Sequence, residues 1–201
     1  MNTPKVSWMS ASIMAAALGV SAVAAAAGEP LKESFRAKGP AGLDRLEQTE
    51  QQQLCSGPVG MSLDAGSAAR IQKAAASRVK MPADGRFIGK WENGQKIAQT
   101  GTGLQSSDDP AVPSGGNCYA CHQLSPDEMS FGTLGPSLAG YGKVRGQSEP
   151  MLQYTWTRIW NSHAHNPCSH MPRFGDAAIL TEDQIRDVMG LLFDPASPVN
   201  R

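Results

Sequence analysis

Cys118-Tyr119-Ala120-Cys121-His122 is the stretch that decides the architecture of this chain of 201 residues. Two thiols separated by two residues can add to the two vinyl groups of one haem, and the adjacent histidine can then bind the iron. A zinc site would need a second pair of ligands at a similar spacing, which the sequence lacks. A thioredoxin-like redox pair would need a strand–helix–strand context, which is also missing. The motif therefore predicts one covalent haem c, with Cys118 and Cys121 as thioether attachments and His122 as an axial iron ligand.

A second axial ligand has to come from the methionines and histidines that follow the motif. The candidates are Met129, Met151, His163, His165, His170, Met171 and Met189. Met171 is favoured because it lies in an expected loop between two helices, and such a loop can carry a thioether to the opposite face of the haem. A histidine ligand (His163, His165 or His170) and an open sixth position are the alternatives. Two strong axial ligands leave no place for a substrate, so this haem is expected to transfer single electrons.

Several residues are predicted to surround the haem without binding the iron. Gly135-Pro136-Ser137-Leu138 follows the motif, and the main-chain carbonyl of Pro136 is expected to accept the second ring N–H of His122. Such a hydrogen bond would fix the orientation of the ring. The candidates to neutralise or hydrogen-bond the haem propionates are Arg145, Trp160 and Arg173. Solvated charge or core packing is an equally open interpretation of these three side chains.

The first 27 residues have the layout of a secretory signal peptide. Lys5 precedes the apolar stretch 11–27, ASIMAAALGVSAVAAAA, which ends in small residues. This stretch is too rich in alanine and slightly too short for a typical transmembrane helix. We therefore expect cleavage near Ala27 and export to the periplasm, where cysteines meet oxidising conditions.

Composition divides the expected mature chain into two parts. Residues 28–82 are polar and poor in large hydrophobic side chains, and segments 41–54 and 64–80 resemble helices with narrow apolar stripes. Neither helix could form a core alone, so both are expected to pack against the following domain or a partner. Residues 28–82 are thus predicted to be a helical N-terminal extension, and residues 83–201 to be the cytochrome domain.

The cytochrome domain is expected to be mostly α, with long loops that wrap the haem. Apolar side chains predict helices between Phe87 and Gly101, over 151–161, and between Thr181 and Pro195. The last helix begins with a capping-box arrangement of Thr181 and Gln184. The low aromatic content of 6 % is consistent with a porphyrin that supplies much of the apolar core.

Charge composition also limits the possible partners. Lys and Arg total 18, and so do Asp and Glu, which gives a net charge of zero. A nucleic-acid-binding protein would show a clear basic excess. Neutrality also disfavours, more weakly, a shuttle that is steered to its partners by a charged face.

Cys55 and Cys168 lie outside the haem motif. Export favours a disulfide between them, which would tie the extension to the loop that contains Met171. In the chain-entropy model, closing a loop of about 110 residues stabilises the folded state by about 4–5 kcal/mol. An intermolecular bond through Cys55, a redox-active cysteine and two buried thiols are the alternatives.

Several short sequences together resemble one family. They are Asn117-Cys118-Tyr119-Ala120-Cys121-His122-Gln123, Gly135-Pro136-Ser137-Leu138, Tyr141-Gly142-Lys143, Asn166-Pro167, Met171-Pro172-Arg173-Phe174-Gly175 and the ending LFDPASPVN. Over roughly residues 84–200 the chain resembles the SoxX family, the small monohaem cytochrome subunits of the SoxAX complexes of bacterial sulfur oxidation. This resemblance implies the class I cytochrome c fold with His122 and Met171 as the axial ligands.

The resemblance also implies partners and a function. SoxX proteins pair with SoxA, a larger haem subunit that carries the catalytic haem, and the complex is an L-cysteine S-thiosulfotransferase. It oxidatively couples thiosulfate to a cysteine of the SoxY subunit of the SoxYZ carrier. This chain would be a non-catalytic subunit that accepts electrons from SoxA and passes them to a soluble periplasmic cytochrome c. The alternatives are a free-standing electron shuttle, a binding module with a structural haem, and a haem enzyme in which Met171 is not a ligand.

Overall fold

The computed structural model describes residues 29–57 and 63–201, and the predicted signal peptide, residues 1–27, lies outside the described residues. The chain divides into two compact units, residues 1–37 and 38–201. In the first unit the structure describes the short helix α2, Glu29–Ser34. The functional candidates all lie in the second unit.

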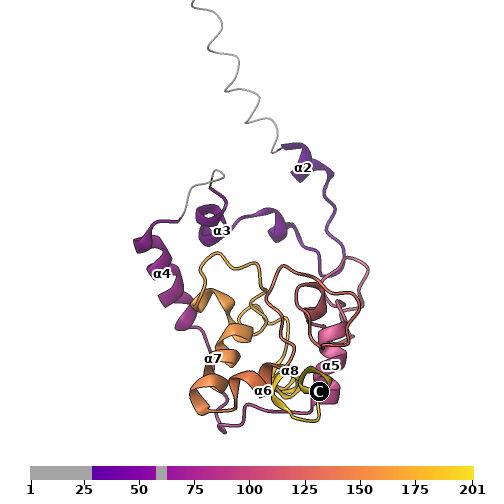
Figure 1. Cartoon of the computed structure of the whole chain (residues 1–201). Coiled ribbons are helices and arrows are strands. Elements are labelled where there is room, and N and C mark those ends of the chain that lie inside the picture. Colours follow the sequence, from indigo (N-terminus) through magenta and orange to yellow (C-terminus); the bar gives the residue numbers. More distant parts are fainter. Residues whose placement is uncertain (1–28, 58–62) are drawn as a thin grey trace, which may run out of the picture. The chain divides into compact units, whose positions relative to one another are not determined.

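The second unit is built from helices and long connections (Figure 1). Its α-helices are α3 (Glu50–Cys55), α4 (Ala65–Ala76), α5 (Trp91–Gln99), α6 (Tyr141–Arg145), α7 (Glu149–Trp160) and α8 (Glu182–Phe193). Its 3-10 turns are η1 (Leu43–Leu46), η2 (Cys118–Ala120), η3 (Ser162–Ala164) and η4 (Pro198–Asn200). The described residues contain one isolated bridge, between Lys38 and Ala41, and no strand. This confirms the prediction of a mostly α protein.

The helices expected around 64–80, 151–161 and 181–195 are present as α4, α7 and α8, whereas the helix expected over 41–54 is divided. Thr49 interrupts it, because the extended backbone of this residue (φ −66°, ψ 159°) makes it the N-cap of α3. The Thr49 hydroxyl accepts a hydrogen bond from the Gln52 N–H, and the Gln52 side chain accepts one from the Thr49 N–H. The expected helix over 41–54 was therefore wrong as a single element. The capping box explains where the new helix begins.

Helix α5 begins four residues after Phe87, so that Phe87 and Ile88 belong to the connection before it. Phe87 is nevertheless buried, and its ring meets the Trp156 ring edge-on at 5.7 Å between centroids. The hydrophobic side chain of Phe87 therefore indicates burial in the core and not a position within the helix. The predicted capping box of α8 is confirmed, since Thr181 and Gln184 satisfy each other's main-chain N–H groups.

Helices α5 and α8 cross closely because each has a glycine at the crossing. A Cβ atom added to Gly94 would lie 2.0 Å from the Asp187 carbonyl oxygen. A Cβ atom added to Gly190 would lie 2.5 Å from the Gly89 carbonyl oxygen. Main-chain atoms cannot yield to such contacts, so the crossing depends on both glycines.

The core lies between α7 and α8. Its fully buried large side chains include Trp156 of α7 and Ile185, Met189 and Phe193 of α8. The hydrogen-bonding group of the largest of them is satisfied, because the Trp156 indole N–H donates to the Lys80 carbonyl at 2.8 Å. This contact also attaches the end of the expected extension to the core.

From Lys38 on, the described residues of the predicted extension do not stand apart from residues 83–201. Residues 38–82 belong to the same compact unit as residues 83–201, and Ile71 and Ala75 of α4 are buried. The prediction that its helices pack against the following domain therefore agrees with the structure. Within the ranges 29–57 and 63–201, no helix is long and apolar enough to cross a bilayer.

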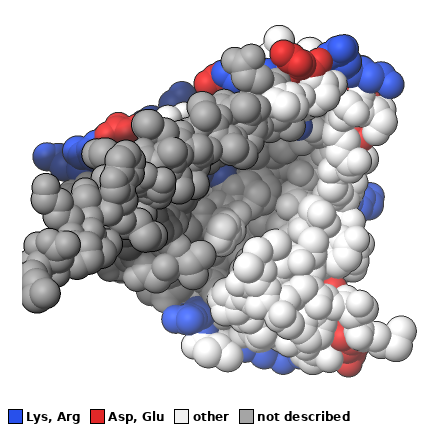
Figure 2. Space-filling view, turned by 90° about the horizontal axis from the view of Figure 1, so that it is seen from above, with Lys and Arg blue, Asp and Glu red and all other residues white. Residues whose placement is uncertain are grey.

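The surface is weakly charged in places. Figure 2 shows one face of the molecule, on which much of the described surface is white and so formed by residues without formal charge. This agrees with a sequence in which only 18% of the residues are charged.

Candidate haem site

The Cys-x-x-Cys-His motif forms a tight turn at the C-terminal end of α5. Asn117, which precedes η2, adopts a left-handed conformation (φ 48°). The N–H groups of Cys121 and His122 both donate to the Cys118 carbonyl, at 3.1 and 2.9 Å. The turn is held to α5 by the Gly116 N–H, which donates to the Ile97 carbonyl at 2.8 Å. The two cysteines and the histidine are thus gathered on one short, anchored turn.

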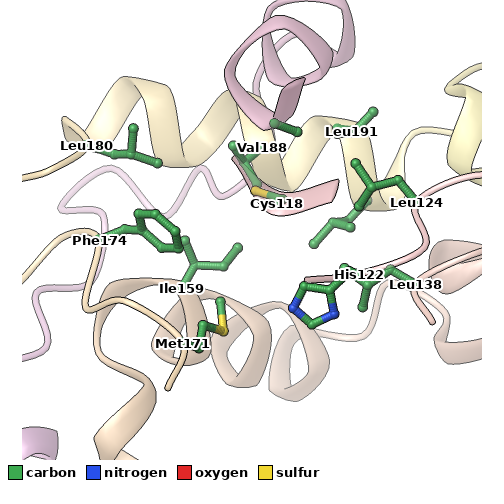
Figure 3. A pocket seen from close by; sticks show the side chains of 12 residues that line it. Cys118, His122, Leu124, Leu138, Ile159, Met171, Phe174, Leu180, Val188 and Leu191 are labelled. Carbon is green, nitrogen blue, oxygen red and sulfur yellow. The ribbon is translucent and has the colours of Figure 1, made fainter. Parts of the chain in front are cut away.

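An apolar pocket adjoins this turn. Its lining residues are Ala98, Cys118, His122, Leu124, Leu138, Ile159, Met171, Phe174, Leu180, Val188, Leu191 and Leu192. The lining therefore comes from α5, the motif, the connection between the motif and α6, α7, the loop after α7, and α8. Figure 3 shows the Met171 side chain and the His122 ring in the lower half of the view, with apolar side chains above and around them. The lining is therefore apolar apart from the His122 ring and the Cys118 and Met171 sulfur atoms, which favours an apolar ligand.

The His122 ring is fixed from two sides. Its Nδ1 atom lies 2.7 Å from the Pro136 carbonyl oxygen, the partner that the sequence predicts. If Nδ1 carries the proton, it donates to this carbonyl and Nε2 is left as a lone-pair donor for a metal. The main chain at Gly135 lies directly against the ring, because a Cβ atom there would be 2.2 Å from Cε1 and 2.7 Å from Nε2.

Among the seven candidates for the sixth ligand, Met171 alone lines the pocket that also contains His122. Met129 is fully exposed, and Met189 is fully buried within the α7–α8 core. The Met151 sulfur lies 3.9 Å from the Thr155 hydroxyl, at the start of α7. The geometry therefore brings one thioether, and no other predicted methionine, to the His122 pocket.

The three histidines among the candidates lie elsewhere on the loop after α7. The Nε2 atom of His163 is 3.1 Å from the Ser169 carbonyl oxygen. Burial lowers the pKa of His163, which favours its neutral ring. His165 packs against the Tyr154 ring at 4.8 Å between centroids, and His170 is exposed. None of these rings lines the pocket.

Neither motif cysteine forms a disulfide, and Cys118 lines the pocket. Burial raises the pKa of the Cys118 thiol to about 12. Redox-active cysteines have depressed pKa values, because the thiolate is the reacting species. The environment of Cys118 is therefore unlike that of a thiol–disulfide oxidoreductase.

In the described part of the chain, no three His, Cys, Asp or Glu side chains come together as a metal-binding cluster.

The predicted propionate contacts are not gathered at the pocket. The Trp160 indole N–H donates to the Arg78 carbonyl at 3.2 Å, so this group is already engaged and the ring packs in the core. Arg173 lies 3.5 Å from the Asp176 carboxylate. The Arg145 guanidinium stacks over the Tyr141 ring, 5.9 Å from its centroid. The structure thus gives each of the three a local protein partner.

Cys55 and Cys168 are joined in a disulfide, with 5.5 Å between their Cα atoms. The bond connects the end of α3 to the loop that carries Met171. Of the alternatives that the sequence leaves open for these two residues, the structure has the intramolecular bond.

These residues together fit a covalently attached haem c. The pocket is apolar, an oriented imidazole and a thioether line it, and a motif thiol reaches it. The cradle of Gly135 and Pro136 holds the ring as a proximal ligand would require. From the sequence, Gly135 stands out only as the first residue of Gly135-Pro136-Ser137-Leu138. Its close contact with the ring could not be predicted, because the contact depends on how the loop folds back on the motif.

Gly135→Ala tests this cradle. We expect the added methyl group to push the His122 ring aside, because it would lie within 2.7 Å of three ring atoms. In a chain that carries haem c, the variant should keep the cofactor through the two thioethers but show altered iron coordination in the visible and electron paramagnetic resonance spectra of the ferric form. Gly57→Ala is the control, since a Cβ atom at Gly57 meets nothing within 4 Å. Spectra of Gly135→Ala identical to those of the parent protein would contradict the cradle.

Comparison with known proteins places the chain in a family. No protein-family model matches the chain. It is 36% identical over 160 residues to a protein of Aquifex aeolicus (strain VF5) named "Uncharacterized lipoprotein", an alignment that covers 77% of this chain and 73% of that protein. At this identity and coverage, the chain belongs to the same family as the lipoprotein of Aquifex aeolicus.

Proposed function

We propose that this chain is an exported monohaem cytochrome c that transfers electrons. One observation carries the proposal: the imidazole of His122, oriented by the Pro136 carbonyl, and the thioether of Met171 line the same apolar pocket, beside a turn that carries Cys118 and Cys121. We further propose the class I cytochrome c fold for residues 83–201, with α5, α7 and α8 around the haem.

Each side chain then has a distinct role. Cys118 and Cys121 would hold the cofactor covalently, so that it could not dissociate. His122 and Met171 would both bind its iron and so exclude substrates from it. The leucine, isoleucine and phenylalanine side chains of the lining exclude water. When bound, the haem supplies one-electron redox chemistry.

Export is supported by three features. The N-terminal sequence has the layout of a signal peptide, and the relative from Aquifex aeolicus is named a lipoprotein. The disulfide between Cys55 and Cys168 also suits an oxidising compartment. We therefore propose a periplasmic location.

The specific function that we propose is that of the electron-transfer subunit in a SoxAX complex. Support for this part comes from the sequence resemblance to the SoxX family, in particular Met171-Pro172-Arg173-Phe174-Gly175 and the C-terminal LFDPASPVN. The partner would be the SoxA haem subunit, which couples thiosulfate to the carrier SoxYZ. This chain would pass the electrons released there to a soluble cytochrome c.

Purification of the native protein from the periplasm tests this proposal. Haem staining after denaturing electrophoresis should label the chain, and a Cys118→Ala, Cys121→Ala double variant should lose the stain. A stable companion that carries its own haem should copurify in a one-to-one ratio. Thiosulfate should reduce the pair when a SoxYZ carrier with a free SoxY cysteine is present to accept the sulfur group. A chain without covalent haem would refute the cytochrome. A monohaem protein that stays monomeric at micromolar concentration would refute the SoxAX assignment and favour a free electron shuttle.

A further inference from the structure

The loop after α7 carries Met171, and residues far away in the sequence hold it in place. Figure 1 shows this orange-to-gold part of the chain reaching α3 and α4. Between the end of α7 at Trp160 and the start of α8 at Glu182, the loop contains one 3-10 turn, η3. A connection of this length with so little secondary structure needs outside contacts to keep one conformation.

The outer side of the loop is attached to α3 and α4. Cys168, which lies three positions before Met171, is bonded to Cys55. The Gln51 side-chain amide donates to the Pro167 carbonyl, and the Gln72 amide donates to the His165 carbonyl at 3.0 Å. The loop is thus attached at His165, Pro167 and Cys168 to side chains of α3 and α4.

The base of the loop is attached to the C-terminal end of α4 and to the residues that follow it. Asn161, which is fully buried, donates to the Ala75 carbonyl at 3.5 Å and to the Asp176 carboxylate at 3.1 Å. Arg78 forms an ion pair with Asp176 at 3.1 Å. Both ends of the loop therefore depend on residues 75–78.

Short hydrogen bonds within the loop connect these attachments to Met171. The buried Ser162 hydroxyl donates to the Met171 carbonyl at 2.7 Å. The Met171 N–H donates to the Ser169 hydroxyl at 3.2 Å. Ser169 follows the disulfide-bonded Cys168 directly, so a displacement of Cys168 reaches the methionine through two residues.

We propose that two described segments, residues 50–57 and 63–80, together form a brace that positions the Met171 thioether in the proposed haem pocket. Cys55, Gln51 and Gln72 are its positioning residues, which act on Met171 through the loop rather than by touching the haem. This inference rests on the proposed function, because it assigns a purpose to the segment only if Met171 is a ligand.

The brace has a physical rationale. A methionine on an unrestrained loop would occupy the ligating position for only a fraction of the time, and its effective affinity for iron would fall by that fraction. The disulfide closes a long loop and removes many alternative conformations of the chain. The Gln51 and Gln72 side chains further restrict the position of the loop, because each donates to one of its main-chain carbonyl groups.

Two variants test the brace in the full-length, haem-loaded protein. One is the Cys55→Ala, Cys168→Ala double variant, which removes the disulfide without leaving a free thiol. The other is Gln72→Ala, a milder change that leaves the disulfide intact. Gln147→Ala is the matched control, because the Gln147 amide donates to the Phe193 carbonyl at 2.9 Å, away from the loop.

Three measurements are made on each protein: the ferric thioether-to-iron charge-transfer band, the midpoint potential, and amide hydrogen exchange over residues 165–171. We expect the double cysteine variant to retain covalent haem, to lose most of the band, to have a lower potential, and to exchange these amides about tenfold faster or more. Gln72→Ala should show smaller changes in the same direction, and Gln147→Ala should show none in this segment.

The outcomes separate the brace from the proposed function. An unchanged band, potential and exchange rate in the double cysteine variant would overturn the brace, while the cytochrome would stand. Equal effects of Gln72→Ala and Gln147→Ala would also overturn it, because they would show general destabilisation. Absence of the charge-transfer band in the parent protein would refute Met171 ligation and, with it, the positioning role, even if exchange in the loop still depended on the disulfide.

Discussion

Met171→Ala should lower the midpoint potential of the haem by about 100 mV or more, since axial ligands set haem potentials over a range of about 0.8 V. The thioether favours ferrous iron, and alanine offers no ligand in its place. Haem should stay attached through Cys118 and Cys121, the charge-transfer band should vanish, and the ferrous form should now bind carbon monoxide. Potentiometric titration and visible spectroscopy measure these changes.

Met129→Ala is the matched control for this substitution. It removes a thioether that is fully exposed and does not line the pocket, so potential and spectrum should both be those of the parent protein. If Met171→Ala also left both unchanged, the ligand assignment would be rejected. Variants of His163, His165 and His170 would then identify the true ligand.

The second large effect concerns stability. Gly94→Ala should reduce the free energy of unfolding by about 3 kcal/mol, because overpacking a tight contact costs about 1–3 kcal/mol and this contact involves main-chain atoms. The new methyl group would lie 2.0 Å from the Asp187 carbonyl oxygen and 2.9 Å from the Leu191 Cβ atom. The two helices would have to separate, and Leu191 lines the pocket proposed for the haem. Thermal unfolding should show a melting temperature lower by about 10 °C.

Gly66→Ala is the corresponding control, since Gly66 also lies inside a helix, α4. A Cβ atom there would meet only the Asp64 carboxylate, at 3.2 Å. Alanine favours helix over glycine by up to about 1 kcal/mol, so this change should leave stability within about 1 kcal/mol of the parent. A Gly94→Ala protein as stable as Gly66→Ala would show that the α5–α8 crossing is looser than the structure has it.

The helices of this protein could largely be predicted from local patterns. The apolar spacing of α7 and α8 and the Thr181–Gln184 capping box are properties of neighbouring residues, and the structure agrees with them. The interruption at Thr49 was missed because a capping residue and a helical residue differ in backbone conformation, which the apolar pattern does not report. The short helix α6, Tyr141–Arg145, was missed because it is less than two turns long.

The candidate site, like the helices, could be predicted from the sequence only in part. The sequence by itself determined the chemistry: Cys118, Cys121 and His122 stand together in a motif whose spacing suits one cofactor, and Met171 stands in a loop that can reach it. Only the tertiary structure decided which side chains share the pocket, that Gly135 supports the His122 ring, and that α3 and α4 hold the loop of Met171. The reason is that motif spacing is fixed by covalent geometry over a few residues. Contacts across a hundred residues depend instead on how the whole chain packs.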